Sequence, residues 1–171
     1  MGWATFLKWR ETGTGDPASL YRQALEIDPH NVYANTMLGH WLMWQGEPPS
    51  AARPYFDAAI SSGKERLFVR SFQLAAVRNR NNETGDAELV RVVNSMRQQN
   101  EPLDERSARA AYLVFQSHYG PRPRTTDATP IDVPLPDQLA TFNWLTRMPA
   151  VAGRAEVVDV VVARLNNAIG R

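Results

Sequence analysis

Apolar residues in the stretch 32–45 recur every three or four positions along the chain. They are Tyr33, Met37, Leu38, Trp41, Leu42 and Trp44. This spacing places them on one broad face of a helix, so it predicts an amphipathic helix. Both ends are marked, because Pro29 cannot extend a preceding helix and Gly46 favours the left-handed backbone that ends one.

A second helix is expected directly after the turn at Gly46. Pro48 and Pro49 suit a helix start. An apolar face follows, made of Tyr55, Ala58, Ala59 and Ile60. Pro54 removes one backbone hydrogen bond from this helix, so we expect the helix either to start late or to bend. The pattern predicts two helices joined by a tight turn.

The same arrangement occurs upstream at a constant distance of 34 residues. The matching pairs are Tyr21 and Tyr55, Ala24 and Ala58, and Pro29 and Gly63 (55 − 21, 58 − 24 and 63 − 29 each give 34). A fixed offset at several positions indicates an internal repeat.

The repeat continues downstream in a weaker form. Leu38 and Leu42 map by the same offset to Phe72 and Ala76. A partner helix is expected next, with an apolar side made of Leu89, Val92, Val93 and Met96. The pattern therefore predicts a third helical pair with fewer matching positions.

The stretch 20–63 resembles a tetratricopeptide repeat. The resemblance is carried by a hinge of the form A-L-x-I-D-P that ends at Pro29, the Leu38-Gly39 pair, Gly46, Ala51, Tyr55 and Ala58. It covers about residues 3–99, and the best-formed repeat is 30–63. It implies an all-α fold, a short α-solenoid of about three helix-turn-helix units that bury their apolar faces by stacking on one another.

Small residues are expected to set the distance between the two helices of a pair. Gly39 would let the helices approach closely, with Ala51 and Ala58 as the matching small residues on the second helix. Pro29 would break the chain between pairs. The other residues expected to pack in and between the repeats are Tyr21, Ala24, Leu38, Leu42, Gly46 and Tyr55.

Additional C-terminal helices are expected to cap the solenoid. Residues 100–120 predict one helix that ends at Gly120, and residues 137–171 predict a helical pair, at about 137–147 and 153–169. The last helix has a valine-rich seam, made of Val158, Val161, Val162, Leu165 and Ile169. So many valines also suit a strand, but the spacing favours a helix.

Residues 121–136 form a connection with five prolines and no helical spacing. Two hypotheses remain open for this segment. It could be a ligand for the aromatic groove of another domain, or it could lie across the concave surface of this protein. We favour the second, because the helices that follow must pack back onto the stack.

The first helix of each repeat lines the concave wall of such a solenoid, as the resemblance implies. The candidate partner-binding residues there are Tyr33, Thr36, His40, Met43, Trp44, Arg70, Leu74 and Arg78. The alternative is that Met43, Trp44 and Leu74 pack between repeats or under the C-terminal helices. Family members that hold a C-terminal carboxylate use a lysine, asparagine and arginine set. The matching places here carry Thr36, Met37, His40, Leu67 and Ser71, so that set is not present.

No catalytic or metal-binding pattern is found in the sequence. The three histidines, His30, His40 and His118, lie in different segments without the spacing of a helical zinc site. The chain has no cysteine, and it has no glycine-rich phosphate loop or nucleophile motif. We therefore expect no catalysis, no cofactor and no metal.

The charge balance limits the class of partner. Nineteen basic residues stand against eighteen acidic ones, so nucleic-acid binding is not expected, even with the arginine-rich stretches 78–82 and 121–124. No run reaches the roughly 18 apolar residues that a membrane helix needs, so no membrane insertion is expected. The absence of cysteine does not decide the compartment. A cytoplasmic location is favoured, with a periplasmic one open if the chain is a fragment of a longer exported protein.

These expectations lead to a functional hypothesis. The chain would bind a protein or peptide partner, of an identity that the sequence does not give, on a concave helical surface and would act as a scaffold without catalysis. The alternative is a regulatory or homo-oligomerising domain of a larger enzyme or of a secretion or assembly protein. Self-association would then use Trp3, Trp9 or the valine-rich seam.

Overall fold

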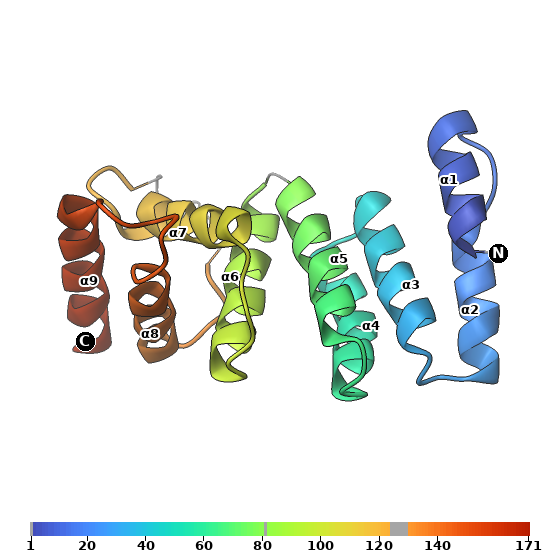
Figure 1. Ribbon diagram of the computed structural model, residues 1–171. Helices are drawn as coiled ribbons and strands as arrows, with labels where there is room; N and C mark the ends of the chain where they lie inside the picture. The colour runs from blue at the N-terminus through green and yellow to red at the C-terminus, as the bar shows by residue number, and fades with distance from the viewer. Residues whose placement is uncertain (1, 81, 124–129) are drawn as a thin grey trace. The chain divides into compact units, whose positions relative to one another are not determined.

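The computed structural model describes residues 2–80, 82–123 and 130–171, without the side chain of Trp3. In these residues all regular secondary structure is α-helical, which confirms the predicted all-α class (Figure 1). The helices are α1 (Gly2–Thr12), α2 (Pro17–Ile27), α3 (Val32–Trp44), α4 (Pro49–Ser61), α5 (Arg66–Asn79), α6 (Glu83–Gln98), α7 (Glu105–Tyr119), α8 (Leu135–Leu145) and α9 (Ala155–Ile169).

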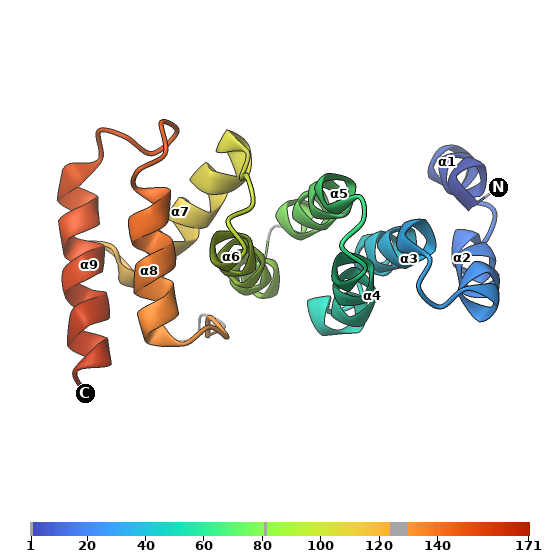
Figure 2. The ribbon, with the colours of Figure 1, turned by 60° about the horizontal axis from the view of Figure 1, so that its bottom comes forward.

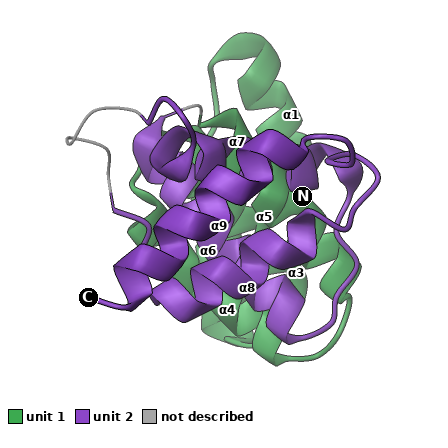
Figure 3. Ribbon diagram, turned by 90° about the vertical axis from the view of Figure 1, so that its left-hand side faces the viewer, with its two compact units in different colours: residues 1–80 green, residues 81–171 purple. Residues whose placement is uncertain are grey.

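The chain divides into two units, which Figure 3 colours separately. Unit 1 holds residues 1–80 and unit 2 holds residues 81–171. The boundary falls inside the range 3–99 that the sequence suggests as one array of repeats. It separates α5 from α6, the two helices expected to pair, whereas α5 packs against α3 and α4 within unit 1.

Helix α3 lies at the centre of unit 1 and packs against α2, α4 and α5 (Figure 2). Every residue from Ala34 to Trp41 is buried. The prediction of an amphipathic α3 is therefore wrong, because neighbouring helices cover it on more than one side. A helix that is apolar around most of its circumference belongs in a core.

Local signals set the helix ends in unit 1. The Asp16 side chain accepts a hydrogen bond from the Ala18 amide at 3.0 Å, and the Asn31 side chain accepts one from the Ala34 amide at 2.8 Å. These are the N-cap interactions that stabilise free amides in a first helical turn. Gly46 takes a φ of 87°, which reverses the chain after α3. Helix α4 starts at Pro49 and continues through Pro54.

The buried face of α4 differs by one position from the predicted face. Ala51, Tyr55 and Ala58 are half-buried. The residues buried in their place are Ala52, Phe56 and Ala59. Since one residue turns an α-helix by about 100°, the start of α4 at the prolines decides which residues point at α3.

Gly39 is a point of close approach in unit 1, but its neighbour is a ring. A Cβ atom built on Gly39 would lie 3.0 Å from Cε2 of Phe56. The predicted matching residues, Ala51 and Ala58, do not take this place. Gly39 therefore makes room for an aromatic side chain rather than for two alanines.

Unit 2 encloses its core between α6, α7, α8 and α9. Its fully buried side chains include Tyr112, Phe115, Phe142, Leu145, Val161 and Leu165. The Phe142 ring lies 5.6 Å from Tyr112 and 5.3 Å from Phe115, measured between centroids. The valine-rich segment forms helix α9, so the helical alternative for it is confirmed.

Polar side chains link α6 to α8 in unit 2. Arg97 donates to Asp137 at 2.9 Å and to the Thr141 hydroxyl at 3.2 Å. Thr141 in turn donates to the Asn94 side chain at 2.9 Å. Thr141 is fully buried and Asn94 is 8% exposed, so this network satisfies polar groups that would otherwise cost free energy inside the unit.

The proline-rich connection is described only in part, since residues 124–129 lie outside the described residues. Near its end, Ile131 and Val133 are buried. The Gln138 side chain of α8 donates to the Val133 carbonyl at 2.7 Å, and Tyr119 donates to Gln138 at 2.7 Å. The last part of the connection is thus held by unit 2. Whether 124–129 crosses a groove stays a hypothesis.

Candidate partner-binding surface

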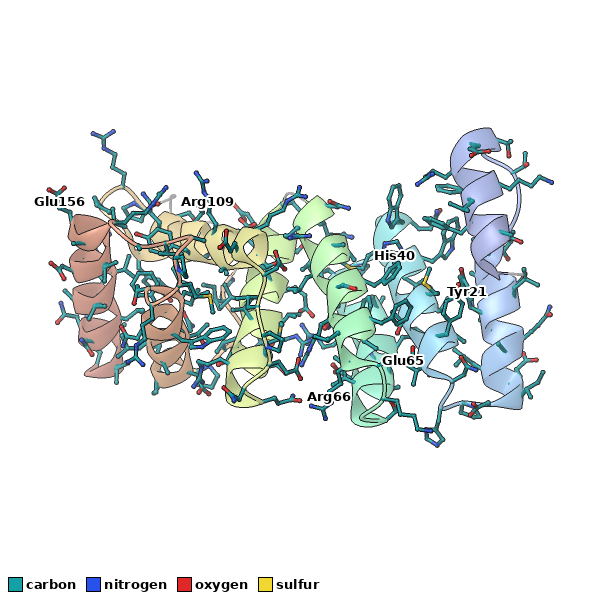
Figure 4. All side chains as sticks on the ribbon, in the orientation of Figure 1. Tyr21, His40, Glu65, Arg66, Arg109 and Glu156 are labelled. Atoms are coloured by element: carbon teal, nitrogen blue, oxygen red, sulfur yellow. The ribbon has the colours of Figure 1, made fainter. Side chains whose placement is uncertain are left out.

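Five rings form a continuous row where α3 packs against α5. In order they are Tyr33, Phe68, Phe72, His40 and Trp44, here called the aromatic row. Successive ring centroids lie 6.0, 4.9, 5.1 and 6.1 Å apart. Figure 4 labels His40 of the row, together with Tyr21, whose ring centroid is 6.3 Å from that of Tyr33.

The two ends of the aromatic row are exposed, and its middle is half-buried or buried. Tyr33 and Trp44 are 43% and 44% exposed, whereas His40 is 6% exposed. Phe68 and Phe72 are half-buried and pack against the core cluster of unit 1. The row is therefore both a packing seam and a surface with two aromatic anchors.

The His40 imidazole sits between rings from three helices. Its neighbours are Phe6 of α1 at 5.8 Å, Phe72 of α5 at 5.1 Å and Trp44 of its own helix. The Trp44 indole N–H donates to His40 Nε2 at 3.1 Å. His40 Nδ1 is buried and has no partner within the described part of the chain.

Burial away from water lowers the pKa of His40 to about 4. A charged imidazole is penalised in this apolar setting, and a proton on Nε2 would also remove the acceptor that Trp44 uses. His40 is therefore neutral near pH 7. Burial also raises the pKa of Tyr33, so the aromatic row carries no charge at that pH.

The other predicted partner-binding residues are less accessible than the sequence suggests. Thr36, Met43, Arg70 and Leu74 are each at most 7% exposed, and Arg78 is half-buried. Thr36 donates to the Val32 carbonyl, and Arg70 donates to Gln73. Because these side chains lie inside the fold, they support the surface from below and offer it little area.

The predicted packing residues fall into three groups. Tyr21, Leu38 and Gly39 are buried. The half-buried ones are Ala24, Leu42, Ala51, Tyr55 and Ala58, and the exposed ones are Pro29 and Gly46. Desolvation, with a smaller contribution from Tyr33, raises the pKa of Tyr21.

Phe68 and Phe72 were not among the predicted partner-binding residues. The 34-residue offset maps Phe72 onto Leu38, which is expected to pack within the repeat, so the sequence indicates an interior role for Phe72. The sequence did contain a signal for a shared surface, because phenylalanines four residues apart lie on one face of a helix. Which neighbour that face meets depends on tertiary packing.

A cavity of about 310 Å³ lies between the C-terminal parts of α3 and α5, here called the α3–α5 cavity. It is lined by Met43, Trp44, Ala76, Asn79 and Arg80. Trp44 thus ends the aromatic row and also lines this cavity. Arg80, which the sequence suggested only as part of an arginine-rich stretch, donates to the backbone carbonyls of Gly46 and Glu47.

The structure also bears on the predictions for Trp9 and for a membrane helix. The Trp9 ring packs on Trp41, with centroids 4.6 Å apart and planes at 82°, so Trp9 has a role inside unit 1. The Trp3 side chain lies outside the described residues. Among the described helices, none has the length and apolar character to span a membrane.

Comparison of the chain with protein-family models, with curated proteins and with solved structures finds no match. The geometry of the aromatic row and of the α3–α5 cavity therefore carries the functional argument.

Proposed function

We propose that unit 1 binds a protein or peptide partner on the surface formed by α3 and α5 and acts as a scaffold without catalysis of its own. The observation that carries this proposal is the aromatic row, whose ends Tyr33 and Trp44 are more than two-fifths exposed. Exposed tyrosine and tryptophan side chains supply much of the binding energy in protein interfaces. Their inner neighbours hold them in fixed positions, so little conformational entropy is lost on binding.

The proposal includes a tetratricopeptide-like stacking of the helical pairs in unit 1. Helices α3 and α5 start at Val32 and Arg66, 34 residues apart (66 − 32). Five buried positions of α3 have buried counterparts at the same offset in α5. The pairs are Asn35 and Val69, Thr36 and Arg70, Gly39 and Gln73, His40 and Leu74, and Met43 and Val77. This periodicity supports equivalent helices in successive units of a repeat.

Affinity capture from the organism of origin tests the proposal, with the full chain as bait. The test variant is Tyr33→Ala combined with Trp44→Ala, and the matched control is Leu113→Ala on α7, where the leucine is 45% exposed. We expect the control to retain the proteins that the unmodified chain captures and the double variant to lose them. Proteins retained equally by all three baits would contradict the proposal.

The size of the full chain in solution separates this proposal from self-association. Light scattering over a hundredfold range of concentration would give a constant monomer mass if the surface binds a different protein. A dimer that the double variant abolishes would instead support the homo-oligomerising alternative.

A further inference from the structure

The α3–α5 cavity has apolar walls at Met43, Trp44 and Ala76 and polar walls at Asn79 and Arg80. Met43 and Ala76 are 7% and 4% exposed, and Trp44 leaves 44% of its surface open. The volume of about 310 Å³ is near the lower end of the roughly 300–1,000 Å³ typical of ligand pockets. The cavity therefore suits one large side chain better than an extended ligand.

Arg80 adds a positive charge to this cavity. Within the part of the chain that the structure describes, its guanidinium donates to two backbone carbonyls, of Gly46 and Glu47, and to no carboxylate. Its Nε–H is buried without a partner in the same part of the chain. Neutral carbonyl oxygens fix the position of the guanidinium but do not cancel its charge, so the charge remains available to an anion.

We propose that the α3–α5 cavity binds a large apolar side chain of a partner peptide that carries an aspartate or glutamate next to it. The apolar side chain covers the exposed part of the Trp44 indole, and the neighbouring carboxylate offsets the charge of Arg80. Tryptophan and arginine are among the residue types enriched at binding hot spots. This inference rests on the proposed function and names the chemistry of the partner.

A nucleic acid could also stack a base on Trp44 and place a phosphate near Arg80. Its affinity, however, comes mainly from several simultaneous phosphate contacts with basic residues. The chain has a net charge of only +1, and the residues lining the cavity include one cation, Arg80. A peptide needs only that one charge, so the peptide is the ligand that the charges favour.

Selection from a random twelve-residue peptide library, with the full chain as bait, tests the inference. We expect enriched peptides to contain a large apolar residue beside an acidic one. Calorimetric titration then measures the affinity of the chain for a synthetic copy of the best peptide. It also measures the affinity for a counterpart in which aspartate or glutamate is replaced by asparagine or glutamine. The acidic form should bind more tightly, by about twofold to fivefold at low salt.

Asn79 allows the charge of the cavity to be changed without altering Arg80. It is exposed at the last residue of α5. We expect Asn79→Asp to weaken the acidic peptide and Asn79→Lys to strengthen it, each by about twofold to fivefold, with both effects fading in 1 M salt. Asn167→Asp and Asn167→Lys, at an exposed position of α9, are matched controls and should leave binding unchanged.

The outcomes separate the inference from the proposed function. Peptides that lose affinity in Tyr33→Ala but respond equally to both Asn79 variants would overturn the cavity as the site and leave the proposed function standing. Failure to select any peptide would overturn both. Binding of a single-stranded ten-nucleotide oligonucleotide to the chain, weakened in Asn79→Asp, would overturn the assignment of the ligand as a peptide.

Discussion

Unit 1 and unit 2 both build cores from aromatic residues, but they close those cores to different extents. In unit 2, Tyr112, Phe115 and Phe142 are at most 1% exposed. In unit 1, the aromatic row ends in Tyr33 and Trp44, each more than two-fifths exposed. Leaving apolar rings in water forgoes favourable burial, so this difference points to unit 1 as the part of the chain with a surface to be covered by a partner.

In the part of the chain that the structure describes, the two units also differ in the kind of buried polar group that they leave without a partner: these groups include a titratable imidazole and a hydroxyl in unit 1, and a hydroxyl in unit 2. Unit 2 pairs some of its buried polar side chains across helices, as Thr141 does with Asn94 at 2.9 Å, and leaves the Tyr112 hydroxyl without a partner within the described residues. In unit 1, His40 Nδ1 and the Tyr21 hydroxyl are buried without a partner within the described residues. Unsatisfied buried groups reduce stability. Unit 1 should therefore be the part that responds more strongly to pH and to small changes in its interior.

The largest expected effect comes from truncating a closed aromatic core. Phe142→Ala should lower the free energy of unfolding of unit 2 by about 3–5 kcal/mol, because it leaves a cavity between Tyr112 and Phe115. Trp44→Ala should cost less than half as much, since its ring is already 44% exposed. Urea denaturation followed by circular dichroism measures both changes, and equal losses would contradict the comparison.

Acid should destabilise unit 1 through His40. Its pKa in the folded chain, about 4, lies below the ordinary value of 6.5, so the unfolded chain takes up the proton first. The contribution of neutral His40 to the free energy of unfolding is fully present above about pH 6.5. It is lost as the pH falls to about 4, by about 3 kcal/mol in total.

Denaturation at several pH values between 4 and 7 measures this loss. His40→Gln keeps a polar side chain that does not titrate, so it should remove most of the pH dependence in this range. An unchanged slope in His40→Gln would assign the acid sensitivity to other groups.

Gly39→Ala should destabilise unit 1 by about 1–2 kcal/mol. The added methyl group would lie 3.0–3.2 Å from three ring atoms of the buried Phe56, so the ring must shift within a packed core. Gly170→Ala is the matched control in unit 2, because its nearest atom would be the Asn166 carbonyl oxygen at 3.6 Å. Thermal denaturation of both variants measures the difference, and equal melting temperatures would count against close packing at Gly39.

The smallest effects should come from buried hydroxyl groups. Tyr21→Phe and Tyr112→Phe each remove a buried hydroxyl that has no partner within the described residues, so each should stabilise the chain by up to about 1 kcal/mol. Tyr119→Phe is the contrasting control, because its hydroxyl donates to Gln138 at 2.7 Å. It should destabilise by about 1 kcal/mol, and calorimetric melting measures all three.

The sequence predicts the helices well because their signals are local. Apolar spacing and turn residues placed the C-terminal pair at about 137–147 and 153–169, and the structure has helices at Leu135–Leu145 and Ala155–Ile169. Proline, glycine and capping residues act within a few positions along the chain. The start of α4 at Pro49 follows from the same kind of signal, since Pro48 and Pro49 predicted a helix start there.

The arrangement of these helices was harder to predict. Periodicity shows that α3 has an apolar face, but not that α2, α4 and α5 would surround it. The phase of α4 depends on how its first turn follows Gly46, and this decides whether Tyr55 or Phe56 faces the core. The boundary at residue 80 depends on which helices pack together, which no local pattern in α5 or α6 records.

The candidate site depends both on local sequence signals and on the packing of helices against one another. Tyr33, His40 and Trp44 were predicted from their helix positions, and the structure brings them into one aromatic row. Arg70 and Leu74 were predicted by the same logic but are buried. Helix position alone gives the direction of a side chain. The accessibility of that side chain depends on how closely the neighbouring helices approach.

The hydrogen bonds from Arg80 to the turn at Gly46 and Glu47 tie the end of α5 to the hairpin that precedes it. These hydrogen bonds connect segments 34 residues apart (80 − 46). Because α5 is the last helix of unit 1, we expect its amides to exchange first when these hydrogen bonds are removed. A ligand that binds Arg80 would then change the hydrogen-exchange rate of α5.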